Sequence, residues 1–322
     1  MTPQRPSPVL VVLAFLAIYV VWGSTYLVIR IAVHDIPPFL MAGLRFGIAG
    51  PMLLGYNQMV KGAKPTPIQW RNTAFVGTLM LVCGNGAVCW AEQRVPSGVT
   101  ALLIATTPLW LLCYNWFGGE KKRPTVFQAT GIVLGLIGLA LLVLRTSSQS
   151  KLGAGVDLVG ALTLIGGSFG WASGTMLARR VELPKSPWLA NGMEMTCGGA
   201  LMILIGLLLG EGSQIHFPTP LALGALAYLV VFGSLVALSA YAWLNTVTTP
   251  ARLGTYAYVN PVVAILLGTF VGGEQFTLRA GLSMALILGA VVLLSIQRRA
   301  ASPTATEPTV PLPSPEAACA EA

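Results

Sequence analysis

Charged side chains are scarce in this sequence of 322 residues. They make up 9% of the chain, against about 25% in an average soluble protein. A water-soluble globule could not cover its surface with so few charges, and 55% apolar residues is too many for a disordered chain. The formal charge of +8 in so apolar a chain indicates loops at a membrane surface rather than a face for nucleic acid. The composition predicts an integral membrane protein, with the lipid bilayer and no nucleic acid as partner.

The residues that intramembrane chemistry requires are also few. The histidines, His34 and His216, and the aspartates, Asp35 and Asp157, lie in predicted loops or at the ends of apolar runs. The five cysteines lack metal-ligand spacing, and the chain has no glycine-rich phosphate loop. We therefore expect no enzyme, no catalytic residue, no cofactor, no metal site and no ATP-driven pump.

Long apolar runs are abundant instead. A membrane span needs about 20 mostly apolar residues, and the runs found here are too long for the alternating strands of a membrane barrel. A short N-terminal segment (1–8) precedes them, and a tail rich in proline, alanine, threonine and glutamate (298–322), predicted to be disordered, follows. Ten runs qualify as spans: Val9–Ile29, Phe39–Val60, Thr73–Ala91, Gly98–Trp116, Val126–Leu144, Leu158–Leu177, Trp188–Leu209, Leu221–Trp243, Ala251–Phe270 and Ala280–Ile296.

The chain contains an internal repeat. The matches keep the same order in both halves, and their offset drifts only slightly along the chain. Each half holds five spans, so the second half is inverted relative to the first, as in many secondary transporters. We expect an all-α membrane protein of two inverted five-helix repeats, 9–144 and 158–297, joined by an external linker, 145–157. The matched pairs are Trp22 and Trp171, Arg30 and Arg179, Pro38 and Pro187, Trp90 and Trp243, Pro108 and Pro261, Glu120 and Glu274, and Gly135 and Gly289.

Basic residues in the predicted loops set the orientation. Most of them fall on the side that holds the two termini, for example Lys61, Lys121, Arg180 and Arg299. Because cytoplasmic loops carry an excess of lysine and arginine, both termini are predicted to be cytoplasmic.

Several of these motifs carry a family resemblance. Trp22-Gly23-Ser24 with Arg30, Pro38 and Arg45, and the endings of the two halves at Gly119-Glu120 and Gly273-Glu274, resemble the drug/metabolite transporter superfamily in its ten-helix EamA-type exporter branch. The resemblance covers about residues 9–297. It implies a multi-pass secondary transporter of the bacterial inner membrane that exports amino acids or similar small metabolites.

Two charged residues lie deep inside predicted spans. Arg45 and Glu194 align in the repeat, each seven residues beyond a proline, about 10 Å into its helix. A charge at this depth costs at least about 2.5–3.5 kcal/mol, so it should face protein or water. Arg45 is a candidate for binding a substrate carboxylate, and Glu194 for binding an ammonium group or for carrying a coupled proton. The structural alternative is that the two groups pair or are satisfied locally, and hold helices together.

Polar and aromatic residues recur at helical spacing on several spans. Taken singly, each could serve interhelical hydrogen bonding or interfacial anchoring. Taken together, they are enough to line one amphipathic cavity, to which spans one, three, four, six, eight and nine contribute. The predicted substrate-binding residues are Trp22, Tyr26, Arg45, Asn85, Thr107, Trp171, Glu194, Tyr241, Asn245, Tyr256 and Asn260.

Pro108 and Pro261 fall in the middle of their spans, where each frees the carbonyl four residues earlier. They are candidate hinges, although a plain packing kink explains them equally well. Spans five and ten are almost wholly apolar with strips of small residues, so we expect them at the periphery, packed through those strips.

The sequence thus predicts a secondary transporter, and a monomer, that exports small amphipathic metabolites by alternating access. Aromatic or aliphatic amino acids fit best, because one buried cation and one buried anion suit a zwitterion. A drug carrier or a nucleotide-sugar carrier of the same fold, a channel, and a non-transporting scaffold are the alternatives.

Overall fold

The computed structural model describes residues 7–117, 126–143, 157–215, 217–248, 255–274 and 277–300, which form helices and turns without a strand. The predicted linker up to 156, the tail beyond 300 and the first part of the ninth predicted span, 251–254, lie outside these residues. The first half contains α1 (Pro8–Leu16), η1 (Ala17–Val21), α2 (Trp22–Asp35), α3 (Pro38–Met59), α4 (Pro67–Gly77), η2 (Thr78–Gly86), α5 (Ala87–Ala91), α6 (Ser97–Ile104), α7 (Thr107–Phe117) and α8 (Val126–Val143). The second half contains α9 (Leu158–Ala178), α10 (Pro187–Leu208), η3 (Glu211–Gln214), α11 (Pro220–Tyr228), η4 (Leu229–Leu238), α12 (Ser239–Val247), α14 (Tyr256–Phe270) and α15 (Leu278–Ala300).

Local sequence explains where several helices begin. A hydroxyl residue followed by proline starts α4 at Thr66-Pro67, α10 at Ser186-Pro187 and α11 at Thr219-Pro220. In each case the hydroxyl accepts a hydrogen bond from the backbone N–H three residues later. Proline at the first helical position loses nothing, because its missing N–H would have no partner within the helix.

The helices suit a membrane. Five of the described helices are long and apolar enough to cross one by length and composition, and shorter apolar helices accompany them. Large apolar side chains remain exposed on their outer faces. On α8, for example, Val133, Leu136 and Ile137 are at least half exposed. Such faces would be costly in water and are stable against lipid. The predicted all-α, multi-pass membrane fold is confirmed.

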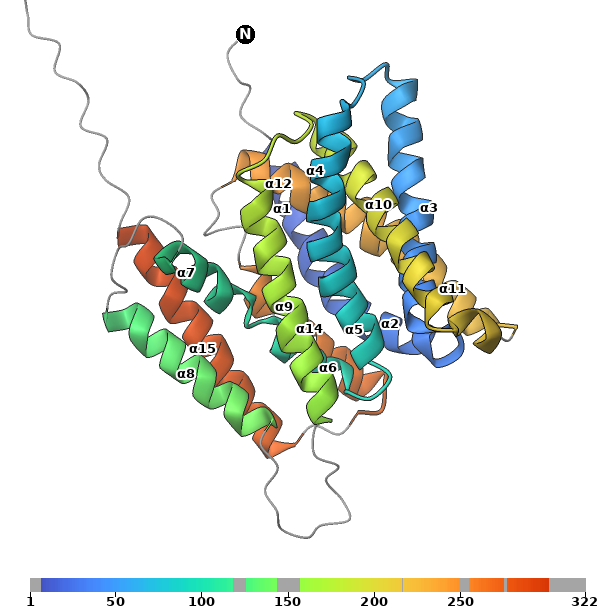
Figure 1. Cartoon of the computed structure of the whole chain (residues 1–322). Helices are drawn as coiled ribbons and strands as arrows, with labels where there is room; N and C mark the ends of the chain where they lie inside the picture. Colours follow the sequence, from blue (N-terminus) through green and yellow to red (C-terminus); the bar gives the residue numbers. More distant parts are fainter. Residues whose placement is uncertain are drawn as a thin grey trace, which may run out of the picture.

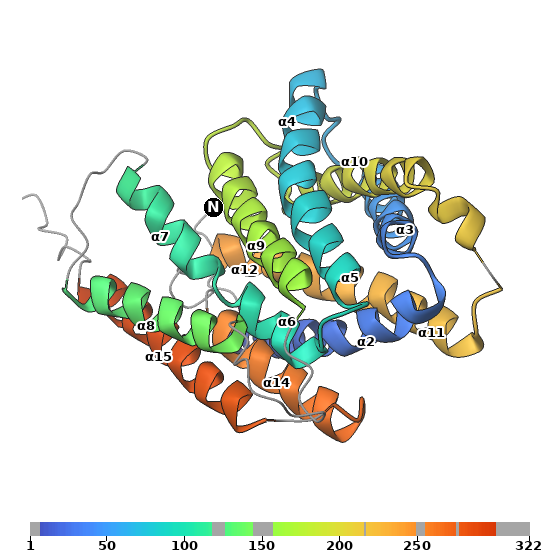
Figure 2. The same ribbon diagram turned by 60° about the horizontal axis from the view of Figure 1, so that its bottom comes forward.

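The two halves interlock rather than forming separate lobes. The first span of each half packs against the third and fourth spans of the other: α2 lies against α11 and α14, and α9 lies against η2, α6 and α7. The repeat-related helices α3 and α10 also pack on each other, as do α8 and α15 (Figure 2). A centre enclosed by these helices is therefore built from both repeats.

Figure 1 shows the inversion of the repeats. The helix from α1 to α2 begins at the top of the view and ends at the lower right, whereas α9 begins at the bottom and ends at the top. The start of α1 and the end of α15 lie towards the same side. The turns between α3 and α4 and between α9 and α10 also lie there. The chain therefore begins and ends its spans on one side of the molecule.

Spans five and ten correspond to α8 and α15, which lie side by side at the edge of the molecule in both views (Figures 1 and 2). Their small residues form the contact. A Cβ added at Gly138 would lie 2.9 Å from a side-chain carbon of Ile287, and one at Gly135 would lie 3.5 Å from the Cβ of Ala290. The small-residue strips are therefore packing surfaces at the periphery, as expected.

The fourth span departs from the expectation of one helix, Gly98–Trp116. It breaks after Ile104 and resumes at Thr107 as α7, directly before Pro108. Thr107 Oγ1 donates to the carbonyl of Ile104, the group that Pro108 leaves without its helical partner, at 2.7 Å. Pro261, by contrast, lies inside a continuous α14. The two repeat-related prolines thus act differently, and Pro108 marks the sharper discontinuity.

The crossing of α3 and α10 depends on glycine. A Cβ at Gly199 would lie 2.5 Å from the backbone nitrogen of Gly47, too close for any side chain. We expect Gly199→Val to force the two helices apart and to destabilise the fold by about 1–3 kcal/mol, the usual cost of overpacking. The measurement is thermal unfolding of the detergent-solubilised protein.

Gly224→Val is the matched control, because nothing lies within 4 Å of a Cβ added at Gly224 on α11. Both variants carry the same helix-propensity change from glycine to valine. Equal melting temperatures for the two variants would contradict the close crossing.

Candidate functional site

A cavity lies where the two halves interlock. It encloses about 870 Å³ of empty space, part of it open to the surroundings, and its wall is mostly apolar. Arg45 is the one charged side chain among the described residues that line it. The wall is formed by α2 (Trp22, Thr25, Tyr26, Ile29), α3 (Arg45, Phe46), η2 and α5 (Leu81, Gly84, Asn85, Val88), α6 to α7 (Ala101, Ile104, Ala105, Thr107), α9 (Gly167, Trp171), η4 (Leu238) and α14 (Tyr256, Ala257, Asn260, Pro261).

The guanidinium of Arg45 is held in place by protein contacts, and one of its donor nitrogens has no partner. Its side chain is 4% exposed, its Nε donates to Ser234 Oγ at 2.9 Å, and its guanidinium lies 4.7 Å from the ring centre of Phe46. Its Nη1 is buried and has no hydrogen-bond partner. A buried cationic donor without a partner is costly, so the site favours an anionic acceptor such as a carboxylate.

The absence of a side chain at Gly233 leaves room for the guanidinium of Arg45. A Cβ at Gly233 would lie 2.9 Å from Nη2 of Arg45, so a larger residue there would displace the guanidinium. Gly233 belongs to the π-helical segment η4, and its carbonyl also accepts a hydrogen bond from Trp22 Nε1 at 3.3 Å. The wider π-helix thus lets one glycine contact both an aromatic and a cationic member of the site.

An aromatic cluster forms one part of the wall. The ring of Trp22 lies 5.1 Å from Tyr241, 5.4 Å from Tyr256 and 6.4 Å from Trp171, measured between centroids. These spacings are within the range that favours aromatic pairs. Because the rings come from spans one, six, eight and nine, they would contact a bound apolar group from both repeats.

The repeat relates the two sides of this site. Trp22 and Trp171 occupy equivalent positions, and each lies against a glycine of a π-helical segment in the other half, Gly233 of η4 and Gly84 of η2. Trp22 bonds to Gly233, while a Cβ at Gly84 would lie 3.1 Å from the ring of Trp171. The first span of each half is therefore seated on the third span of the other in the same manner.

Asn260 joins α14 to the first span. With its amide nitrogen turned towards the acceptors around it, the side chain donates to the carbonyls of Ile18 and Tyr19 at 3.2 Å and of Tyr256 at 3.3 Å. Ile18 and Tyr19 lie in the π-helical η1, whose carbonyls lack the regular α-helical pattern. Asn260 thus supports the wall as well as lining it.

Most of the residues expected from the sequence line the cavity: Trp22, Tyr26, Arg45, Asn85, Thr107, Trp171, Tyr256 and Asn260. Tyr241 joins them through its ring contacts, 5.1 Å from Trp22 and 5.8 Å from Tyr256. The side chain of Asn245 lies outside the described part of the chain. Arg45, a predicted site residue, and Phe46 come from span two, which was not among the spans expected to line the cavity.

Glu194 is not among the described residues that line the cavity. It lies on α10 beside α4, and its carboxyl group interacts electrostatically with Tyr241. In the described residues no ion pair joins it to Arg45, whose contacts are Ser234 and Phe46. The alternative in which these two charges neutralise each other therefore does not apply.

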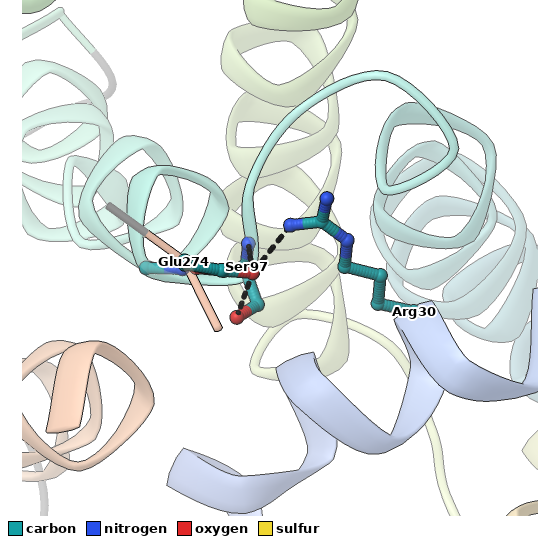
Figure 3. A network of polar contacts seen from close by, with 4 residues as sticks. Arg30, Ser97 and Glu274 are labelled. Carbon is teal, nitrogen blue, oxygen red and sulfur yellow. Dashed lines mark hydrogen bonds and ion pairs between the residues drawn. The ribbon is translucent and has the colours of Figure 1, made fainter. Parts of the chain in front are cut away.

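One polar network was not predicted from the sequence. Arg30 pairs with Glu274, and Glu274 also accepts hydrogen bonds from Ser97 (Figure 3). Arg30 and Glu274 had served only as markers of the repeat. Their recurrence as Arg179 and Glu120 in the other half was the signal that could have identified them as partners.

Comparison with known proteins places this architecture in a family. Residues 9–144 and 158–296 each match the EamA-like transporter family. The chain belongs to that family. The EamA-like transporter is 39% identical over 285 residues, 88% of its own chain and 90% of the relative, to a protein of Escherichia coli K12 named uncharacterized inner membrane transporter YedA.

Other relatives are more distant. The EamA-like transporter is 26% identical over 200 residues, 61% of its own chain and 62% of the relative, to a Salmonella typhimurium protein named probable amino-acid metabolite efflux pump. A crystal structure with 21% sequence identity superposes with a TM-score of 0.61, covering 93% of this chain and 100% of the other. That likeness concerns the fold alone.

Proposed function

We propose that this EamA-like transporter exports small amphipathic zwitterions, best represented by aromatic and aliphatic amino acids, by alternating access. The observation that carries the proposal is the unpartnered, buried Nη1 of Arg45 in an otherwise apolar and aromatic wall. The substrate carboxylate would accept from this donor, and its side chain would contact the Trp22 cluster. The name of the Salmonella relative, an amino-acid metabolite efflux pump, supports the same substrate class.

A nucleotide-sugar carrier is less well supported, because a diphosphate needs more than one cation and Arg45 is the one charged residue of the described wall. The names of the relatives support transport rather than catalysis. We therefore assign the chain no enzymatic activity and no cofactor. The proposed partners are the lipid bilayer and the small-molecule substrate, and the proposed state is a monomer.

We propose that the protein resides in the bacterial inner membrane with both termini in the cytoplasm. The name of the E. coli relative supports the membrane. The orientation is supported by the basic loops: Lys61 and Lys64 precede α4, and Arg180 and Lys185 precede α10. These turns lie on the side that holds the start of α1 and the end of α15 (Figure 1).

Coupling to a proton gradient is assigned to Glu194. Its carboxyl group lies inside a span and has no ion-pair partner among the described residues, which is the situation of a proton-carrying group in a transporter. Its interaction with Tyr241, which packs on Trp22, links that proton to the aromatic side of the cavity.

Pro108, at the break between α6 and α7, is the proposed principal hinge, with Pro261 as its partner in the second half.

The transport experiment uses purified full-length protein in proteoliposomes. Radiolabelled phenylalanine, leucine, lysine, glutamate and UDP-glucose are tested for counterflow, with and without a pH gradient, against protein-free vesicles. We expect phenylalanine and leucine to be transported and UDP-glucose to be excluded. Transport of UDP-glucose alone would favour the nucleotide-sugar alternative, and silence under every gradient would favour a scaffold.

A further inference from the structure

Glu274 holds together three elements: α2, the start of α6 and the segment after α14. Its side chain is 10% exposed and pairs with Arg30 of α2. It also accepts from the backbone N–H and hydroxyl of Ser97, both at 2.8 Å, and from the backbone N–H of Gly98 at 3.3 Å (Figure 3). The carboxylate thus caps the start of α6 while holding α2. We call Arg30, Ser97, Gly98 and Glu274 the latch.

A second carboxylate, that of Glu92, lies beside the latch and interacts electrostatically with Arg30 and Glu274. Glu92 is 2% exposed, and no hydrogen bond of regular geometry reaches either of its carboxylate oxygens, although the backbone N–H of Arg30 lies near. It also stands directly after the last residue of α5, where the helix dipole opposes a negative charge. A buried anion so poorly supplied with donors is unfavourable, so the closed arrangement favours the protonated, neutral form of Glu92.

Glu92 connects the latch with the substrate cavity. It caps the end of α5 four positions after Val88, a residue of the cavity wall, so the two lie on one side of that helix. The helix α9, which also packs on α5, has no titratable side chain between Leu158 and Ala178. The titratable and charged groups around Glu92 are Tyr26 and Arg30 of α2, Glu274 after α14, Cys89 of α5, Arg45 of α3 facing Cys89, and Arg94 in the next turn.

We propose that Glu92 is a proton-binding site that controls the latch. When Glu92 is protonated, Arg30 has one anionic partner, Glu274, and the latch stays closed. When Glu92 loses its proton to water, its charge repels Glu274 and competes for Arg30. The pair then weakens, and α2 separates from the segment after α14. The released proton goes to the aqueous phase on the latch side, and the reverse step takes a proton from that phase.

The consequence for transport rests on the proposed orientation, in which the latch faces the outside. Deprotonated Glu92 then favours the outward-open state, from which an exported substrate leaves. A proton taken up from outside closes the latch and favours the return. Because the proton enters and leaves on the same side, Glu92 makes opening depend on the outside pH and carries no proton across the membrane.

The latch can be tested without any substrate. Spin labels at His34, whose side chain is exposed at the end of α2, and at Val271, exposed after α14, report their separation. The labels go into the full-length protein with its native cysteines replaced by serine or alanine, in lipid nanodiscs. We expect a second, longer distance to gain population as the pH rises from 5 to 9. In Glu92→Gln the short distance should dominate at every pH.

Two further variants keep the test decisive. Glu92→Asp retains a carboxyl group and should restore a pH response, which a merely structural role of Glu92 would not predict. Glu182→Gln removes an exposed carboxylate on the opposite side and should respond as the parent does. A pH response in Glu92→Gln equal to the parent's would overturn the proposal. So would a distance change that follows replacement of sodium by choline instead of pH.

The outcome is separable from the proposed function. The distance measurement needs no transported compound, so a pH-dependent latch in a protein that transports no amino acid would leave the latch standing and reject the substrate. Amino-acid transport by a protein whose latch distance does not change with pH would support the proposed substrate and reject the proposed role of Glu92.

Discussion

Replacing Arg45 by alanine is expected to reduce counterflow of radiolabelled phenylalanine by about a hundredfold. The variant loses a charge-assisted hydrogen bond to the substrate carboxylate in a water-poor site, a contact of about 1.5–3 kcal/mol, or roughly a ten- to hundredfold effect. It also loses the field of the one charged residue in the described wall. Initial rates over a range of phenylalanine concentrations measure the loss.

Arg45→Lys separates charge from geometry. Lysine keeps the positive charge but has no planar fork, so it cannot donate to Ser234 through a nitrogen such as Nε while presenting a second nitrogen to the substrate. We expect an intermediate rate, about tenfold below the parent.

Arg71→Ala is the matched control for loss of an arginine, because Arg71 is exposed on α4 away from the cavity. Membrane abundance and gel-filtration profile establish that each variant is folded. Transport by Arg45→Ala at the parent's rate, at equal abundance, would remove Arg45 from the binding role and return it to a structural one.

Glu194→Gln should abolish transport driven by a pH gradient and leave counterflow largely intact. Glutamine mimics the protonated carboxyl group, so the variant can still change state with substrate bound but cannot exchange a proton. Both modes are measured in the same vesicles with radiolabelled phenylalanine, so that abundance and orientation cancel. The expected result is a large fall in the ratio of gradient-driven flux to counterflow.

Glu92→Gln provides a contrast for Glu194. It should hold the latch closed, which lowers counterflow and gradient-driven transport together. Glu182→Gln should change neither, since that carboxylate is exposed and bonds to Gln69. Unchanged gradient-driven transport in Glu194→Gln would exclude its coupling role. Loss of both modes would indicate a role in binding or folding instead.

The positions of the helices could be predicted from the sequence because a membrane span requires a long apolar run. The ten predicted spans correspond in order to the helices of the described residues, and the family match falls on both predicted repeats. Proline supplied boundaries at Pro38 and Pro187, where it occupies the first helical position. At Pro108 the predicted single span breaks instead. The hydroxyl of Thr107 donates to the carbonyl that the proline frees, and this hydrogen bond lowers the free-energy cost of the break.

Charged residues inside the predicted spans could also be identified from the sequence. Arg45 was found because a charge inside an apolar run must be satisfied by protein or substrate. Glu92 shares a helix face with Asn85 and Cys89 by its spacing, but it follows the third predicted span and was not among the predicted site residues. Its burial goes with contacts between distant parts of the chain: α2 packs against α5, and Arg30 and Glu274 interact with its carboxyl group.

By itself, the sequence determined that this chain is a helical membrane protein with two inverted repeats, and which charged and aromatic residues stand within its spans. These properties depend on local composition and periodicity, which a lipid environment enforces span by span. Only the tertiary structure decided that Trp22 meets Trp171 across the repeats, that Arg45 bonds to Ser234 and not to Glu194, and that Glu274 fastens Arg30 to the start of α6. Such pairings depend on how helices far apart in the sequence cross, and that is set by close contacts at glycines such as Gly199 and Gly233 rather than by hydrophobicity.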